Sequence, residues 1–193
     1  MKITILLVLI ILGCSTLDKK TSDAITSELP NTFTNENILN THEGMTSDLI
    51  MKMYGAPKKV SQDVCGAKYG SPWSCITWEY GQFPYDRASF TFNGDGAEPV
   101  INNFEIVRTK LKLPEEFTTE SVLKIKQGIS SAEIFKMFGA PASVNQSVCG
   151  AETKNTWQCT TWEYGQFPYD RASFTFSGNH KSLILNNFSV DRK

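Results

Sequence analysis

The sequence TWEYGQFPYDRASFTF, Thr77–Phe92, occurs a second time without any change at Thr161–Phe176. The duplication extends well beyond this stretch. A shift of 84 positions aligns Leu29–Arg108 with Leu113–Arg192 without a gap, and 43 of the 80 aligned residues are identical. The chain therefore contains two tandem copies of one unit, and a residue that the fold requires is expected in both.

The N-terminus is typical of an export signal. Lys2 precedes an apolar run, Ile3–Leu12, which as a helix would rise about 15 Å, half of a roughly 30 Å hydrocarbon core. That length favours a signal peptide over residues 1–13 and not a membrane span. Ile11-Leu12-Gly13-Cys14 then resembles the bacterial lipobox, although a smaller residue is usual where Leu12 stands. An ordinary secretion signal with a chance cysteine is the alternative.

The resemblance to a lipobox implies that Cys14 becomes the first residue and carries fatty-acyl chains such as palmitate. Residues 14–28 are polar and have no periodicity, so we expect a flexible tether there. Repeat 1 follows at 29–108, a linker at 109–112 and repeat 2 at 113–193. The whole chain has 19 Lys and Arg against 20 Asp and Glu, and this balance argues against a nucleic-acid partner.

Capping residues predict two short helices at the start of each repeat. Thr34 and Thr118 are N-cap candidates for helices that would end near Thr41 and Lys126. Second helices would begin after Thr46 and Ser130 and end at the glycines of the two Gly-Ala-Pro sequences.

Four strands are expected after the helices of each repeat. In the first copy they would lie at Lys59–Val64, Ser74–Tyr80, Ala88–Asn93 and Val100–Arg108. Each repeat would thus be a helix-helix-antiparallel-sheet unit, and the chain an α+β protein of two such tandem repeats. Because the linker is short, the repeats must pack side by side or share a sheet edge.

Four of the five cysteines fall as one pair in each repeat. The spacing is C-x9-C around a predicted hairpin turn, which suits a disulfide and not the C-x2-C pairs of zinc sites. We therefore expect the bonds Cys65–Cys75 and Cys149–Cys159, each closing an 11-residue loop worth roughly 3 kcal/mol in the chain-entropy model. No metal or other cofactor is expected.

Alternation along the strands predicts one apolar and one polar face. The residues expected in the core, beneath the helices, are Trp78, Tyr80, Phe90, Phe92, Phe104 and Ile106, with Trp162, Tyr164, Phe174, Phe176, Phe188 and Val190 as their counterparts. The opposite, solvated or partner-facing side would carry Thr77, Glu79, Ser89, Thr91, Asn103 and Glu105.

Gly44-Met45-Thr46, Gly55, Pro57 and the Phe90-Thr91-Phe92 strand followed by Gly94 resemble the SmpA/OmlA (BamE) family of small outer-membrane lipoproteins. The tandem arrangement with one disulfide per copy is also similar to the β-lactamase-inhibitory protein (BLIP) fold, which binds another protein. The resemblance covers nearly the whole mature chain. BamE-type proteins use one copy and normally lack these disulfides, and no residue here carries the β-lactamase-binding contacts across.

The sequence offers no convergent catalytic set. His42 and His180 align with Lys126 and Gly96, so neither is needed by the fold, and both are expected on the surface. Glu79 and Asp86 could form a carboxylate pair, but a strand residue and a loop residue in solvent are the simpler roles. We expect that the protein is not an enzyme.

The GQFPYDR loops, residues 81–87 and 165–171, are longer than a tight turn requires. They carry residue types favoured at binding hot spots, so the candidate partner-binding residues are Phe83, Tyr85, Arg87, Phe167, Tyr169 and Arg171. A structural role, with the aromatics over the sheet edge, is the alternative, and recent duplication would also explain the identity.

Taken with the resemblance, the sequence predicts a non-catalytic bacterial envelope lipoprotein that binds a protein partner or assists assembly. Ser15 after Cys14, by family analogy, implies the outer membrane facing the periplasm. The alternatives are a periplasmic enzyme inhibitor of the BLIP kind and, further away, a hydrolase.

Overall fold

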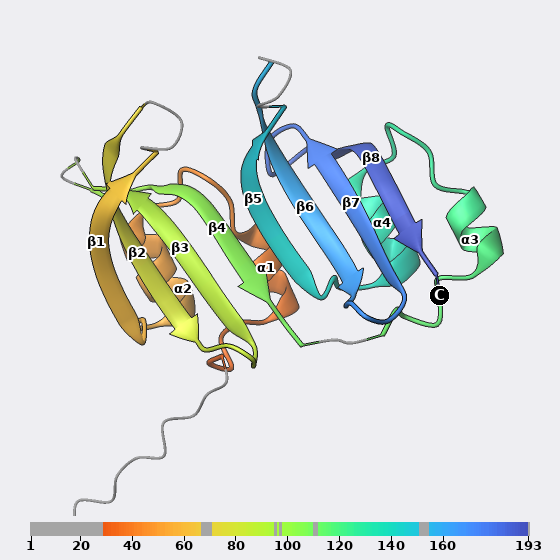
Figure 1. Ribbon diagram of the computed structural model, residues 1–193, viewed down its shortest axis with the longest axis horizontal. Coiled ribbons are helices and arrows are strands. Elements are labelled where there is room, and N and C mark those ends of the chain that lie inside the picture. The colour runs from red at the N-terminus through yellow and green to blue at the C-terminus, as the bar shows by residue number, and fades with distance from the viewer. Residues whose placement is uncertain are drawn as a thin grey trace, which may run out of the picture.

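Four helices and eight strands follow one another in the computed structural model (Figure 1), which describes residues 29–66, 71–94, 96, 98–109, 112–150 and 155–192. The first half contains α1 (Asn35–Asn40), α2 (Ser47–Tyr54), β1 (Lys59–Cys65), β2 (Trp73–Gly81), β3 (Arg87–Asn93) and β4 (Ile101–Val107). The second half repeats this order with α3 (Thr119–Leu123), α4 (Ser131–Phe138), β5 (Ser143–Cys149), β6 (Trp157–Gly165), β7 (Arg171–Ser177) and β8 (Ile184–Asp191). The predicted signal peptide and tether, which include Cys14, and part of the predicted linker lie outside the described residues.

All eight strands form a single antiparallel sheet in the order β1 to β8. The halves are joined by direct pairing of β4 with β5, from Phe104 opposite Gln146 to Val107 opposite Ser143. The assignment to an α+β class with two helix-helix-sheet units is therefore wrong: the molecule is mostly one continuous sheet, and its helices are only five to eight residues long. Sharing an edge gives β4 and β5 hydrogen-bonding partners that separate sheets would leave open.

The helices begin where their caps were predicted. The side chains of Thr34, Thr46, Thr118 and Ser130 each accept a hydrogen bond from a backbone N–H of the first turn. Helix α1 ends at Asn40, as expected, but α3 ends at Leu123 and is shorter than the helix predicted to reach Lys126. In the first half the residue after the helix, Thr41, turns inward, and its hydroxyl lies 2.5 Å from that of Tyr54.

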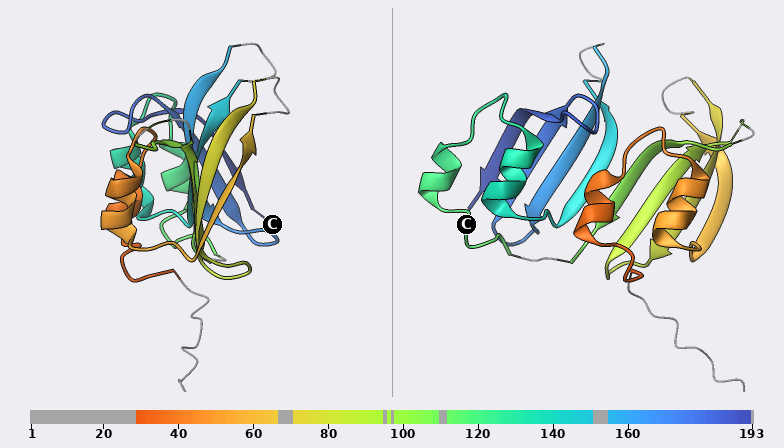
Figure 2. Two further views of the ribbon diagram at one scale, coloured as in Figure 1. Left: turned by 90° about the vertical axis from the view of Figure 1, so that its left-hand side faces the viewer. Right: turned by 180° about the vertical axis from the view of Figure 1, so that it is seen from behind.

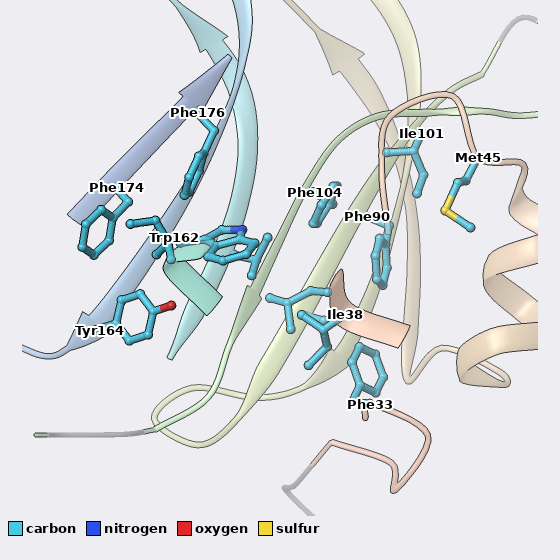
Figure 3. Close-up of a cluster of buried hydrophobic side chains, with 14 of the residues drawn as sticks. Phe33, Ile38, Met45, Phe90, Ile101, Phe104, Trp162, Tyr164, Phe174 and Phe176 are labelled. Atoms are coloured by element: carbon cyan, nitrogen blue, oxygen red, sulfur yellow. The ribbon is translucent and has the colours of Figure 1, made fainter. Parts of the chain in front are cut away.

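The helices cover one face of the sheet and leave the other face open (Figure 2). Aromatic side chains fill the layer between them, among them Phe90, Phe174 and Phe176 (Figure 3), which are fully buried. Phe92 is fully buried as well. The hydroxyl of Tyr80 donates to the carbonyl of Gly55 at 2.9 Å, and Tyr164 repeats this contact with Gly139. Each bond fixes the end of α2 or α4 to the sheet.

An irregularity in β4 makes one core residue depart from the alternation pattern. Thr91 pairs with Asn103 but Phe92 pairs with Ile101, so Asn102 is an extra residue on this strand. A β-bulge of this kind reverses the faces beyond it. Ile101 is consequently buried, and the same irregularity in β8 buries Leu185.

Three residues expected in the core are less buried than predicted. Trp78 and Val190 are half-buried and Phe188 is 39% exposed, whereas Trp162 and Phe104 are 5% and 2% exposed. The difference comes from position in the sheet. The less buried residues lie on β8 or beside β1, the two end strands, whereas Trp162 and Phe104 lie near the junction, where each repeat covers part of its neighbour.

Both predicted disulfides are present. Cys65 is bonded to Cys75 and Cys149 to Cys159, each with a Cα–Cα distance of 5.8 Å. Each bond joins the two strands of one hairpin, and neither crosses between the halves.

Candidate binding surfaces

Each QFPYDR loop leaves its strand through a glycine that the backbone requires. Gly81 has φ +64°, and a Cβ there would lie 2.1 Å from the Asp86 carbonyl oxygen. A turn closes the loop, with the N–H of Tyr85 donating to the Gln82 carbonyl at 2.9 Å, and the Phe83–Pro84 peptide is cis. The second copy has the same turn, the same cis peptide and the same obstruction at Gly165. The two loops therefore share the same backbone turn.

The loop aromatics point to solvent. Phe83 and Tyr85 are 78% and 50% exposed, and Phe167 and Tyr169 are 67% and 48% exposed. The structural alternative holds in part, since the rings are exposed at the sheet end but Asp86 does bond a backbone amide, that of Thr109. Four large exposed side chains in two equivalent places form a candidate contact surface, which we call the loop surface.

The loop arginines, in contrast, differ between the copies. The guanidinium of Arg87 lies over the Phe83 ring, 5.7 Å from its centroid. Arg171 instead donates to Asp191 at 2.9 Å. The residues opposite them in the sheet explain this, since Arg87 pairs with Val107 but Arg171 pairs with Asp191.

The carboxylates near the loops have structural partners. Asp86 accepts a 2.6 Å hydrogen bond from the N–H of Thr109, which ties the first loop to the end of β4. Glu79 forms a 3.1 Å ion pair with Lys59, and Glu163 accepts from the Ser143 hydroxyl at 3.1 Å. The two residues considered as a carboxylate pair, Glu79 and Asp86, are thus each bonded to another group, Glu79 to Lys59 and Asp86 to the Thr109 N–H.

Both loops lie at the same end of the sheet, at the lower edge of Figure 1. Leu29, the first described residue, lies there too and lines a hollow with Tyr85, Asp86 and Thr109. The disulfide-bonded strand ends lie at the opposite end of the sheet. The start of the described chain and the loop surface therefore share one end.

A second candidate site is a cavity of about 280 Å³ at the junction between the halves. His42 and His180 stack at its rim with ring centroids 3.6 Å apart and ring planes within 9°. No sequence pattern predicts this contact, because neither histidine is repeated in the other copy and they are far apart in the chain.

Glu43 connects the halves within this cavity. Its N–H donates to the Gln146 side-chain oxygen at 2.7 Å, and its carboxylate accepts from the Gln158 amide at 3.2 Å. Partial burial raises the pKa of the Glu43 carboxyl. The pKa of His180 is lowered, first by desolvation and then by the nearby positive charges of His42 and Lys181.

Among the described residues no group of three or more His, Cys, Asp or Glu side chains is arranged to hold a metal ion. In the same part of the chain, no helix has the length and apolar character needed to cross a bilayer. No protein-family model matches the chain, and no curated protein matches it significantly.

Proposed function

We propose that the protein is a non-catalytic bacterial envelope lipoprotein that binds another protein and supports assembly of a complex. Its anchor is the acylated Cys14, in the outer membrane and facing the periplasm. The observation that carries the binding proposal is the loop surface: the same exposed aromatic pair, Phe83 with Tyr85 and Phe167 with Tyr169, occurs twice on one rigid sheet.

Covering an exposed aromatic side chain with a partner surface is favourable, because apolar area is removed from water. Aromatic residues and arginine dominate binding hot spots because they bury large areas at small entropic cost. Two such contacts on one frame reinforce each other, and linked binding can raise apparent affinity by as much as 10²–10⁴ when both engage. The duplicated loop surface is thus suited to a partner that offers two sites or one extended surface.

The proposal can be tested by capture from detergent-solubilised envelope with the full chain as bait. One variant carries Phe83→Ala and Tyr85→Ala, a second carries Phe167→Ala and Tyr169→Ala, and a third carries all four changes. Each single-loop variant should capture less of the partner, and the fourfold variant should capture none.

A matched control uses two equally exposed side chains at the other end of the sheet. Val64 and Val148 are equivalent in the two copies and are 61% and 55% exposed. Their replacement by Ala should leave capture intact. Because the loop side chains are exposed, the fourfold variant should keep its unfolding free energy within about 1 kcal/mol of the wild type.

Two outcomes would contradict the proposal. If the fourfold variant unfolds, the loops are structural. If it folds and still captures the same partner, the binding site lies elsewhere. The identity of the captured protein separates an assembly role from inhibition of a periplasmic enzyme.

A further inference from the structure

The junction between the halves is an interface that the chain builds with itself. At its centre β4 pairs with β5, and Ile106 lies opposite Val144 on the buried face. Arg108 extends the contact: its N–H donates to the Ala142 carbonyl at 2.8 Å and its guanidinium to the Pro141 carbonyl at 2.6 Å. Strand pairing, apolar contact and a charged donor thus act together here.

Helix α1 belongs to the first half but reaches the second. It lies behind β4 and β5 (Figures 1 and 2), and its Leu39 lines the junction cavity together with Trp162. This helix accounts for the burial of Trp162, since Trp78 has no preceding repeat to cover it. Figure 3 shows Trp162 on the side of the second half that faces the first.

The same shift of 84 positions that relates the repeats maps each side of this junction onto a free end of the molecule. Val144 is 3% exposed, but its counterpart Val60 on β1 is 58% exposed. Leu39 is half-buried, but its counterpart Leu123 on α3 is 76% exposed. Figure 1 and the right-hand view of Figure 2 show helix α3 beyond β8, where no further strand covers it. Helix α1 would be left in the same position if the second half were absent.

We propose that a second copy of this chain docks on this end, so that β8 of one copy pairs antiparallel with β1 of the next. We call this the head-to-tail contact. The junction supplies its register, because shifting the β4–β5 pairs by one repeat gives the pairs of the new interface. These pairs are Phe188 with Gln62, Ser189 with Ser61, Val190 with Val60, and Asp191 with Lys59.

The residues at the two ends suit this register. Val190 opposite Val60 preserves the apolar pair of the junction. Asp191 opposite Lys59 places opposite charges side by side, and such cross-strand pairs stabilise a sheet. Lysine on an edge strand normally discourages pairing with other chains. An aspartate at the one position that faces it makes this edge selective for β8.

The existing contacts of these end residues can be exchanged at low cost. Asp191 now pairs with Arg171 at 2.9 Å and Lys59 with Glu79 at 3.1 Å, and all four side chains are well exposed. Exposed ion pairs contribute little to stability. Arg192 now donates to the Phe117 carbonyl at 2.7 Å. In the head-to-tail contact it would take the place of Arg108 and donate to the carbonyl of Pro57.

This contact uses two different surfaces, the β1 end of one copy and the β8 end of the next. After every addition, one β1 end and one β8 end of the row therefore stay free. Such heterologous contacts build rows rather than closed dimers. The inference depends neither on the lipid anchor nor on the loop surface, because β1, β8 and α3 lie outside both.

Engineered cysteines on the open face of the sheet test the contact directly. Directly opposed strand residues lie within disulfide-forming distance, so Ser61→Cys in one copy should bond to Ser189→Cys in another. The two single variants of the full chain, mixed in detergent and mildly oxidised, should give one dimer band that contains both. A chain with both changes should give a ladder of multimers.

A second pair of variants separates the contact from chance collision. Val60→Lys places a charge against the apolar side of Val190 and should lower the yield of the 61–189 bond about tenfold or more. Val64→Lys is the matched control, since Val64 is an equally exposed residue of β1 outside the proposed register. It should leave the yield unchanged.

The inference is overturned by any of three results. The first is that no bond forms between residues 61 and 189 at about 100 µM protein, a concentration at which contacts far weaker than standard interfaces are populated. The second is that bonds form equally well between two copies of the same variant. The third is that Val60→Lys leaves the yield of the 61–189 bond unchanged. Peptide mapping identifies which cysteines are joined.

Discussion

His42 stacks on His180 across the junction, with ring centroids 3.6 Å apart. The two rings come from different halves of the chain. The pKa of His180 is lowered, first by desolvation and then by the positive charges of His42 and Lys181.

We predict that His42→Gln raises the pKa of His180. Desolvation is the largest cause of the lowered pKa and should persist, so the return toward 6.5 should be partial. NMR titration of the imidazole protons measures it, and Lys181→Gln provides a comparison for the weaker positive neighbour. A titration of His180 that His42→Gln does not move would contradict the stacked arrangement.

The lowered pKa of His180 also predicts how the stability of the fold changes with pH. Because the pKa of His180 is lower in the folded state, the unfolded chain binds the proton first as pH falls through about 6.5. Folding should therefore lose stability over that range and regain it as pH rises. Urea unfolding at several pH values checks this, and the slope attributable to the pair should diminish in His180→Gln.

We predict unequal costs for the two equivalent tryptophans. Trp162→Ala removes a buried ring and should lower the unfolding free energy by about 3–5 kcal/mol. Trp78→Ala should cost distinctly less, because Trp78 is only half-buried at its end of the sheet. Denaturant unfolding at low protein concentration measures both. Equal costs would mean that the two ends of the sheet are not as different as the structure shows.

We predict that each disulfide stabilises the fold by a similar amount. Replacing Cys65 and Cys75 together by Ala opens one 11-residue loop and should cost roughly 3 kcal/mol, and the pair Cys149 and Cys159 should behave alike. Thermal unfolding gives the values, and peptide mapping of unreduced protein verifies the pairing. Fragments that join Cys65 to Cys149 would refute it.

We predict that Cys14 carries lipid in the mature protein. Cells grown with a fatty-acid analogue should label the wild type but not Cys14→Ser, and the variant should leave the membrane fraction. An unlabelled wild type would leave an ordinary secretion signal as the explanation for residues 1–13.

Local features of the fold were predictable because they depend on neighbouring residues. The capping threonines and Ser130 marked the starts of the helices, and alternation placed Phe90 and Phe92 inside. The C-x9-C spacing identified both disulfides. In each case a short segment contains all the interacting groups, so the pattern alone is sufficient.

Other features depend on which segments become neighbours, and no local pattern encodes that. Alternation assigns the faces of β4 but does not reveal that β5 lies beside it, so the sequence left open whether the repeats pack side by side or share a sheet edge. The extra residue Asn102 moved Ile101 into the core. Burial of Trp162 depends on a helix from the other half, and the stacking of His42 on His180 depends on the same junction.

The loop surface could be proposed from residue types, but its exposure could not. Phe83 and Tyr85 on a longer loop suit either a binding site or a cover for the sheet edge. Only the path of the backbone from Gly81 decides between them, and it directs both rings outward.

The position of Leu29 at the loop end of the sheet sets a limit on where a partner can be found. Leu29 is fifteen positions after Cys14, and an extended chain of that length reaches about 50 Å at most. With a lipid on Cys14, the loop surface stays within that radius of the bilayer. A partner that binds there would then be held within reach of the membrane surface, whether it is itself embedded in the bilayer or recruited from solution.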